Sequence, residues 1–195
     1  MPEPQASLTA AVQQSTTSSG GFDVSMPYCT FMSTTFCATG LGTPPGVLDS
    51  MAKQVQELGV RPELEVFDFG HLVYVHEMIH KGLLDDPIMI QLCMGIAYGA
   101  PDDPGTFMAL VNQLPRDCVF SAFSISKMQL PFVAMAALAG GNVRVGLEDN
   151  LYLGPGHKAT NAELVARAKQ ILESMNVRVK GPQEVRDQLK LVKHG

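Results

Sequence analysis

Three charged side chains that could carry chemistry stand close together near position 145: Arg144, Glu148 and Asp149. A carboxylate can remove a proton from the carbon next to a carbonyl group, and a second carboxylate can bind a metal ion that polarises the carbonyl oxygen. An arginine beside them can hold anionic groups through paired hydrogen bonds. The same residues could instead form a structural ion pair, with Asp149 capping the following turn. Their spacing alone leaves both interpretations open.

The stretch that carries these residues has the two-residue period of a β-strand. Apolar side chains at 143, 145 and 147 alternate with Arg144, Gly146 and Glu148. Such a strand fits a barrel with helices outside and a polar site inside. Glu148 and Asp149 then fall at the carboxyl end of the strand, where barrel enzymes keep their catalytic groups.

Strands and helices are predicted to alternate along most of the chain. Strands are expected over 28–37, 64–69, 88–96, 118–125 and 143–148, and helices over 47–58, 72–83, 103–114, 130–138, 160–175 and 182–192. This alternation predicts right-handed crossovers and a parallel sheet. The best fit is a (β/α)8 TIM-type barrel of the α/β class, with a doubly wound open sheet as the alternative.

The predicted barrel is short of strands. A complete barrel typically needs ~250 residues, whereas this chain has 195, enough for one domain over 1–195. We therefore expect an incomplete barrel whose early strands are missing. Residues 1–21 are poor in charge and rich in Ser, Thr and Gln, and are either a disordered start or the remnant of an early strand.

Composition excludes several classes of protein. A net charge of -5 without a basic patch argues against a nucleic-acid partner. No run approaches the ~18 apolar residues of a membrane helix, and no secretory signal opens the chain. The four cysteines form no C-x-x-C pair, which predicts reduced thiols and a cytoplasmic location; they are Cys29, Cys37, Cys93 and Cys118.

Several segments resemble the β-keto acid cleavage enzymes, whose founding activity is the cleavage of 3-keto-5-aminohexanoate. The resemblance is carried by 62–72 (PELEVFDFGHL), 91–96 (QLCMGI), 143–153 (VRVGLEDNLYL) and 159–165 (ATNAELV). It implies a zinc-dependent (β/α)8 barrel of amino-acid catabolism, a cytoplasmic homo-oligomer that converts a β-keto acid and acetyl-CoA into acetoacetate and a new acyl-CoA. By this resemblance Glu148 is a zinc ligand, Asp149 the general base and Arg144 the group that poises this base, while the residues that bind acetyl-CoA stay unassigned.

The sequence also departs from that family. The family's two other zinc ligands form an H-x-H pair on an early strand, and none of the five histidines here stands in such a pair. We therefore expect the chain to begin near the family's third or fourth strand, as a fragment or truncated relative that could be inactive. Ser126-Lys127 stands where the family often has Gly-Arg. One carboxylate is also short of the about three protein ligands that a catalytic zinc usually has.

Two further hypotheses come from the same sequence. His76, Glu77 and His80 match the H-E-x-x-H motif of zinc metallopeptidases, in which two histidines share one helix face. No further part of such a motif follows, and the segment belongs to a helix expected outside the barrel, so coincidence is the favoured interpretation. The other hypothesis is a non-catalytic remnant that keeps the partial barrel fold.

Overall fold

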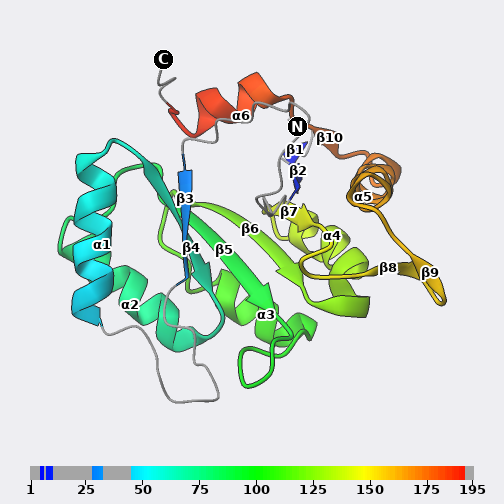
Figure 1. Cartoon of the computed structure of the whole chain (residues 1–195), viewed down its shortest axis with the longest axis horizontal. Coiled ribbons are helices and arrows are strands. Elements are labelled where there is room, and N and C mark those ends of the chain that lie inside the picture. The colour runs from blue at the N-terminus through cyan, green and yellow to red at the C-terminus, as the bar shows by residue number, and fades with distance from the viewer. Residues whose placement is uncertain (1–4, 7, 11–27, 33–44, 192–195) are drawn as a thin grey trace, which may run out of the picture.

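A curved sheet of six parallel strands forms the centre of the molecule (Figure 1). The computed structural model describes residues 5–6, 8–10, 28–32 and 45–191. The strands lie in the order β2-β7-β6-β5-β4-β3. Their bounds are β2 (Leu8–Ala10), β3 (Tyr28–Met32), β4 (Arg61–Val66), β5 (Met89–Met94), β6 (Val119–Ser124) and β7 (Asn142–Val145).

The strand order identifies a partial barrel rather than a doubly wound sheet. From β3 to β7 each strand lies beside the next strand in sequence, without the reversal of order that defines a doubly wound fold. β2 then follows β7 at the far edge, which is where the first strand of a closed barrel meets the last. The predicted incomplete (β/α) barrel is thus confirmed. Among the described strands, however, its open side lies between β2 and β3, inside the chain rather than before its first strand.

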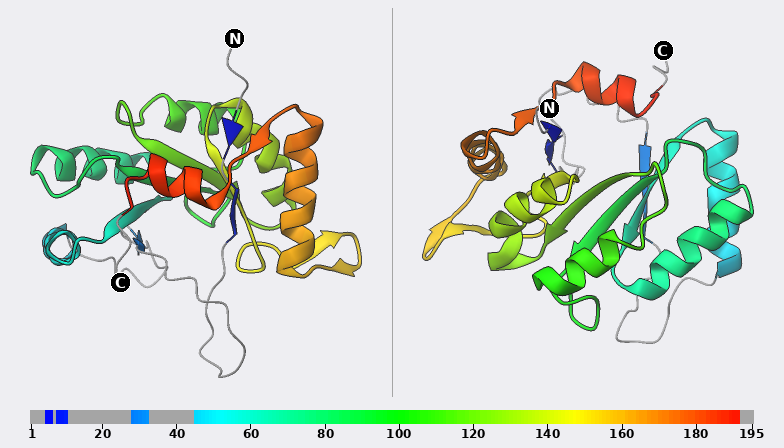
Figure 2. Two further views of the ribbon diagram at one scale, coloured as in Figure 1. Left: turned by 90° about the horizontal axis from the view of Figure 1, so that it is seen from above. Right: turned by 180° about the vertical axis from the view of Figure 1, so that it is seen from behind.

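Helices follow the outside of the curved sheet (Figures 1 and 2). Some of them begin at a side chain that caps the helix: Asp68 accepts from the Gly70 N–H, and Thr160 with Glu163 forms the predicted capping box. Because Asp68 caps a helix, β4 ends at Val66, three residues before the predicted end of that strand. The helices are α1 (Pro45–Glu57), α2 (Phe69–His80), α3 (Pro104–Val111), α4 (Gln129–Leu138), α5 (Asn161–Ser174) and α6 (Pro182–Gln188).

The apolar core lies between the sheet and these helices. Val66, Leu92 and Val143 on the strands have no exposed surface, and Phe107 and Phe132 from α3 and α4 meet edge to face at 5.4 Å between ring centroids. The opposite, concave side of the strands carries buried polar residues. The alternation of apolar outward and charged inward that the sequence predicted for β7 is therefore present.

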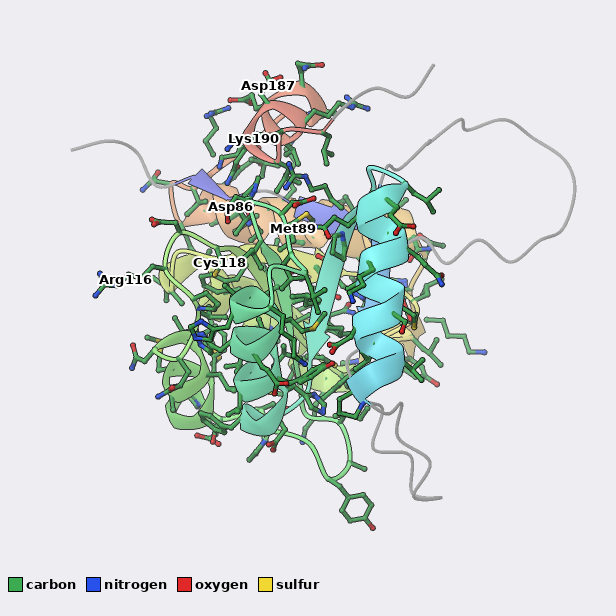
Figure 3. The ribbon with its side chains drawn as sticks, turned by 90° about the vertical axis from the view of Figure 1, so that its left-hand side faces the viewer. Asp86, Met89, Arg116, Cys118, Asp187 and Lys190 are labelled. Carbon is green, nitrogen blue, oxygen red and sulfur yellow. The ribbon has the colours of Figure 1, made fainter. Side chains whose placement is uncertain are left out.

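Smaller elements complete the two ends of the barrel. A hairpin of β8 (Tyr152–Gly154) and β9 (His157–Lys158), which the sequence analysis did not predict, follows β7, and β1 (Gln5–Ala6) pairs with β10 (Arg178–Val179). Figure 3 shows α6 beyond the end of the sheet where β5 and β6 begin. Within the described ranges no helix is long and apolar enough to cross a membrane.

Candidate active site

Arg144 is the centre of a buried charge cluster at the carboxyl end of the sheet. It lies on β7 and is 7% exposed. Its Nε donates to Asp149 Oδ2 at 3.0 Å, and its Nη2 donates to Asp149 Oδ1 at 3.2 Å. The same Nη2 also donates to Glu148 Oε2 at 2.6 Å. The structure thus brings together all three residues that the sequence analysis singled out.

Two residues from β4 and β5, which are not adjacent to β7, join this cluster, and sequence reasoning missed both. Arg144 Nη1 donates to Gln91 Oε1 at 2.6 Å and lies 3.8 Å from Glu65 Oε1. Gln91 Nε2 in turn donates to Ser121 Oγ and to Glu63 Oε1 at 3.2 and 3.4 Å. The signal that could have found the glutamates is their alternation with Leu64 and Val66 in an otherwise apolar strand. Such an alternation places them on the inner face.

The register of the strands aligns Glu65, Gln91 and Ser121 in one row. Glu65 pairs with Gln91 across β4 and β5, and Gln91 pairs with Ser121 across β5 and β6. Phe123 on β6 forms a cation–π contact with Arg144, whose guanidinium carbon lies 4.3 Å from the centroid of the phenylalanine ring. The guanidinium is therefore held from several sides, and its orientation is fixed before any ligand binds.

A tight turn after β7 fixes Asp149. The Asp149 and Asn150 N–H groups both donate to Gly146 O, at 3.2 and 3.1 Å, and Gln129 Nε2 reaches the same oxygen at 3.0 Å. The Ser126 N–H donates to Asp149 O at 2.7 Å. The Asp149 carboxylate is consequently anchored through its backbone as well as by Arg144, as a preorganised catalytic group would be.

Burial changes the acidity of the cluster. Burial raises the pKa of Asp149 to about 6, although Arg144 favours its ionised form. Burial likewise raises the pKa of Glu65 to about 7. The charge of Arg144 lowers this pKa, and the nearby carboxylates raise it further. For Arg144 burial acts against the charge, but Asp149 and Glu148 outweigh it, and the pKa of the guanidinium is raised. A buried carboxyl group that titrates near neutrality can accept a proton at physiological pH.

Three further side chains near the carboxyl end of the sheet differ in their exposure and partners. Glu148 is more open than Asp149, with side-chain exposures of 42% and 3%. Burial raises the pKa of the Cys93 thiol, which favours its protonated, less nucleophilic form. His71, just after β4, accepts a hydrogen bond from the Phe67 N–H at Nδ1.

The described residues do not supply a complete metal centre. No group of three His, Cys, Asp or Glu side chains within them is placed to hold a metal ion. In the H-E-x-x-H segment, His76 Nε2 lies 3.0 Å from Gln113 O, and Glu77 pairs with Lys81 at 2.6 Å. This segment lies on α2, outside the barrel as expected. Glu148 is the one predicted zinc ligand in the cluster, and it is engaged by Arg144.

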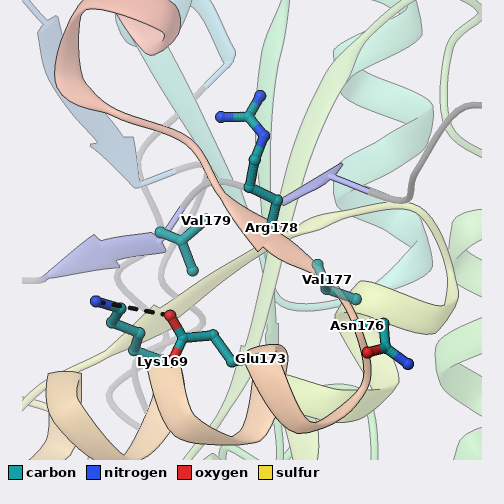
Figure 4. A pocket seen from close by; sticks show the side chains of 6 residues that line it. All are labelled: Lys169, Glu173, Asn176, Val177, Arg178 and Val179. Carbon is teal, nitrogen blue, oxygen red and sulfur yellow. Dashed lines mark ion pairs between the residues drawn. The ribbon is translucent and has the colours of Figure 1, made fainter.

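Two cavities flank the last part of the barrel. One, of about 580 Å³, lies between 126–130 and the 150–156 segment that contains β8. The other, of about 520 Å³, lies between α5 and β10 (Figure 4). In the second cavity Lys169 and Glu173 point toward each other and pair at 3.6 Å, while Arg178 points away and pairs with Glu184.

Residues 7–191 match the family model described as beta-keto acid cleavage enzyme. The chain belongs to this family. Within it, the chain is 56% identical over 149 residues to the 3-dehydrocarnitine:acetyl-CoA trimethylamine transferase of Rhizobium meliloti (strain 1021), an alignment that covers 76% of this chain and 50% of the relative. It is 32% identical over 145 residues to the 3-keto-5-aminohexanoate cleavage enzyme of Acetoanaerobium sticklandii, covering 74% and 53%.

This β-keto acid cleavage family member spans about half the length of the curated relatives it matches. A solved structure, the binary complex of ObcA with oxaloacetate, superposes with a TM-score of 0.71 at 21% identity. That superposition covers 84% of this chain and 45% of the other. It shows the same fold. The family resemblance stated from the sequence is confirmed by the family model and the curated relatives.

Proposed function

We propose that this chain carries the proton-transfer part of an acetyl-CoA-dependent β-keto acid cleavage site. Asp149 is the general base, and Arg144 holds it in position and tunes its charge. The observation that carries the proposal is a 3% exposed carboxylate with a pKa raised to about 6, bound through two oxygens by a buried arginine. Such a base is mostly ionised at pH 7 and still basic enough to take a proton from the carbon next to a keto group.

Glu65 acts in this proposal on the far side of the guanidinium. Its carboxylate lies 3.8 Å from Arg144 Nη1, opposite the nitrogen atoms that bind Asp149. Together with Gln91 it keeps the guanidinium turned toward Asp149 while the charge of Asp149 changes. Glu65 is therefore a positioning residue that has no contact with the reacting carbon.

The substrate class proposed is a β-keto acid that bears a quaternary ammonium group. The 56% identical relative is named for 3-dehydrocarnitine and trimethylamine. The cluster here has four carboxyl groups around one guanidinium, which gives an interior that favours a cationic substrate. These carboxyl groups belong to Glu63, Glu65, Glu148 and Asp149.

Zinc dependence, a cytoplasmic location and a homo-oligomeric state are carried over from the resemblance as further parts of the proposal. Glu148 would be one zinc ligand. The described residues offer too few others for a centre with about three protein ligands, so they do not fit a complete zinc site and no step here is assigned to a metal. The metallopeptidase hypothesis has no supporting contact around His76 and Glu77 and is not proposed.

The test is turnover of 3-dehydrocarnitine with acetyl-CoA, measured as formation of a new acyl-CoA with and without added zinc. Asp149→Asn should lower kcat by about 10²–10⁴-fold, because the amide cannot accept the proton. Glu77→Gln is the control and should leave turnover unchanged. Absence of turnover in the unaltered chain would support the non-catalytic remnant, and a loss in Glu77→Gln with none in Asp149→Asn would overturn the assignment.

A further inference from the structure

The cavity of about 580 Å³ beside the charge cluster is not used by the proton transfer described above. It lies between the 3-10 turn η1 (Ser126–Met128) with the start of α4 on one side and the β8 side of the hairpin on the other. We infer that this cavity binds the coenzyme A part of the acyl-CoA, with Lys127 contacting its phosphate groups. The inference rests on the proposed function, in which acetyl-CoA is the co-substrate.

The cavity lies next to Asp149, the proposed general base. Asn150, which lines the cavity, follows Asp149 directly in the chain, and the Ser126 N–H donates to Asp149 O. The lining residues belong to the loops after β6 and β7, the last two strands of the barrel. In TIM-type barrels the loops after the last two strands frequently bind phosphate groups. A ligand in this cavity could therefore reach the cluster while its phosphates lie outside the barrel mouth.

Charge distinguishes this cavity from the cluster. Among the described residues, nine line the cavity, none of them is acidic, and Lys127 is the only charged one. Lys127 is exposed and has no hydrogen-bond or ion-pair partner within residues 45–191. The carboxylates around Arg144 would repel the phosphates of a coenzyme A molecule, whereas this cavity offers a free ammonium group. The anionic end of the co-substrate is thus expected at Lys127.

The walls suit the neutral arm of coenzyme A. Leu130, Leu153 and Pro155 are apolar, and Gly154 has open space where a side chain would stand. Asn150 fixes the start of the hairpin, because its Nδ2 donates to Tyr152 O at 2.7 Å and its Oδ1 accepts from the Tyr152 N–H at 3.1 Å. Because the hairpin is already ordered, its backbone N–H and C=O groups can form hydrogen bonds with the amides of this arm at a low entropic cost.

The cavity between α5 and β10 provides the contrast. Its Lys169 is paired with Glu173 (Figure 4). Its Arg178 forms two short hydrogen bonds with Glu184, at 2.8 and 2.7 Å. An anionic ligand there would have to displace these carboxylates. Of the two cavities, only the one with Lys127 combines an unpaired cation with closeness to Asp149.

Calorimetric titration with coenzyme A tests the inference directly and does not need turnover. Lys127→Ala should raise the Kd for coenzyme A by about tenfold or more, because a charge-assisted contact to phosphate is lost. Pantetheine, which has no phosphate, should bind this variant and the unaltered chain equally. Lys158→Ala is the matched control. Lys158 is an exposed lysine on β9 of the neighbouring hairpin, and its side chain does not line the cavity.

A second variant tests the cavity itself. Gly154→Leu places a side chain in open space at a position with ordinary backbone angles, and should weaken binding of both coenzyme A and pantetheine. Coenzyme A binding that is unaffected by Lys127→Ala and Gly154→Leu, or absent from the unaltered chain, would overturn the inference. Turnover that persists in that case would leave the proposed function standing. If the two variants lose coenzyme A binding as expected but the unaltered chain shows no turnover, the proposed function is refuted and the coenzyme A site is retained.

Discussion

Two networks of charged side chains in this molecule have nearly the same contact distances and very different surroundings. On the outer surface, Lys81 Nζ lies 2.8 Å from Asp49 Oδ2 and 2.6 Å from Glu77 Oε1, joining α1 to α2. Inside the barrel, Arg144 forms hydrogen bonds of 2.6–3.2 Å with Asp149, Glu148 and Gln91. The Lys81 side chain is 39% exposed, whereas that of Arg144 is 9% exposed.

Burial gives the two networks opposite acid–base behaviour. The hydrogen bond from Lys81 lowers the pKa of Asp49, which is what a partner of opposite charge does in water. Asp149 accepts hydrogen bonds from Arg144 through both of its carboxylate oxygens, yet its pKa is raised, because loss of water outweighs the attraction. The surface network therefore links two helices through ion pairs, whereas the buried network positions a carboxylate that can exchange a proton near neutral pH.

Removing the central arginine should show the largest difference between the networks. Arg144→Met keeps an unbranched side chain about as long as the stem of arginine up to Nε, removes the charge, and leaves Asp149 and Glu65 buried without their counter-charge. We expect a loss of about 3–5 kcal/mol in the free energy of unfolding at pH 8, measured by urea denaturation. The loss should shrink at pH 5, where both carboxyl groups can be protonated. An equal loss at both pH values would contradict the assignment of the cost to unpaired charge.

A smaller effect is expected from Glu65 as the pH changes. Its pKa is raised to about 7 in the folded protein, above the ~4.3 of an unfolded chain. The folded state therefore binds the proton more tightly, so the stabilising contribution is complete below about pH 4 and is lost as the pH rises through 7. Stability should fall between pH 5 and 8.

Glu65→Gln removes this titration, so the fall in unfolding free energy between pH 5 and 8 should become smaller by on the order of 1–3 kcal/mol. Thermal unfolding at a series of pH values measures the change. Glu184→Gln is the control, because the hydrogen bonds from Arg178 and the Gly181 N–H lower the pKa of Glu184 to about 2 and its titration lies below this range. A pH profile of Glu65→Gln that coincides with the original would refute the role of Glu65.

What the sequence could predict was mostly local. Arg144 and Asp149 were found because they lie five positions apart on one strand and its following turn, and the capping box of α5 was found because Thr160 and Glu163 belong to the same helix start. Gln91 and Glu65 contact Arg144 from other strands, and the sequence pattern did not specify the register that brings them together. Partners that depend on register become visible only in the assembled sheet.

The hairpin of β8 and β9 was missed for a different reason. Its strands are short, and no element is predicted between 148 and 160, although Gly154-Pro155-Gly156 is a turn signal. The position of β2 beside β7 was also beyond sequence reasoning, because three residues carry no periodic pattern. Both elements frame the carboxyl-end site, so the cavity with Lys127 could not be anticipated from the chain alone.

The smallest effect is expected on the surface network. Lys81→Met removes the ammonium group from Asp49 and Glu77 but leaves both carboxylates in contact with water, so neither becomes a buried unpaired charge. Asp49 also keeps the hydrogen bond from the Tyr74 hydroxyl at 2.6 Å. The melting temperature should change by little more than the error of the measurement, and any change should disappear in high salt. A loss comparable to that of Arg144→Met, or one that persists in salt, would mean that burial is not what separates the two networks.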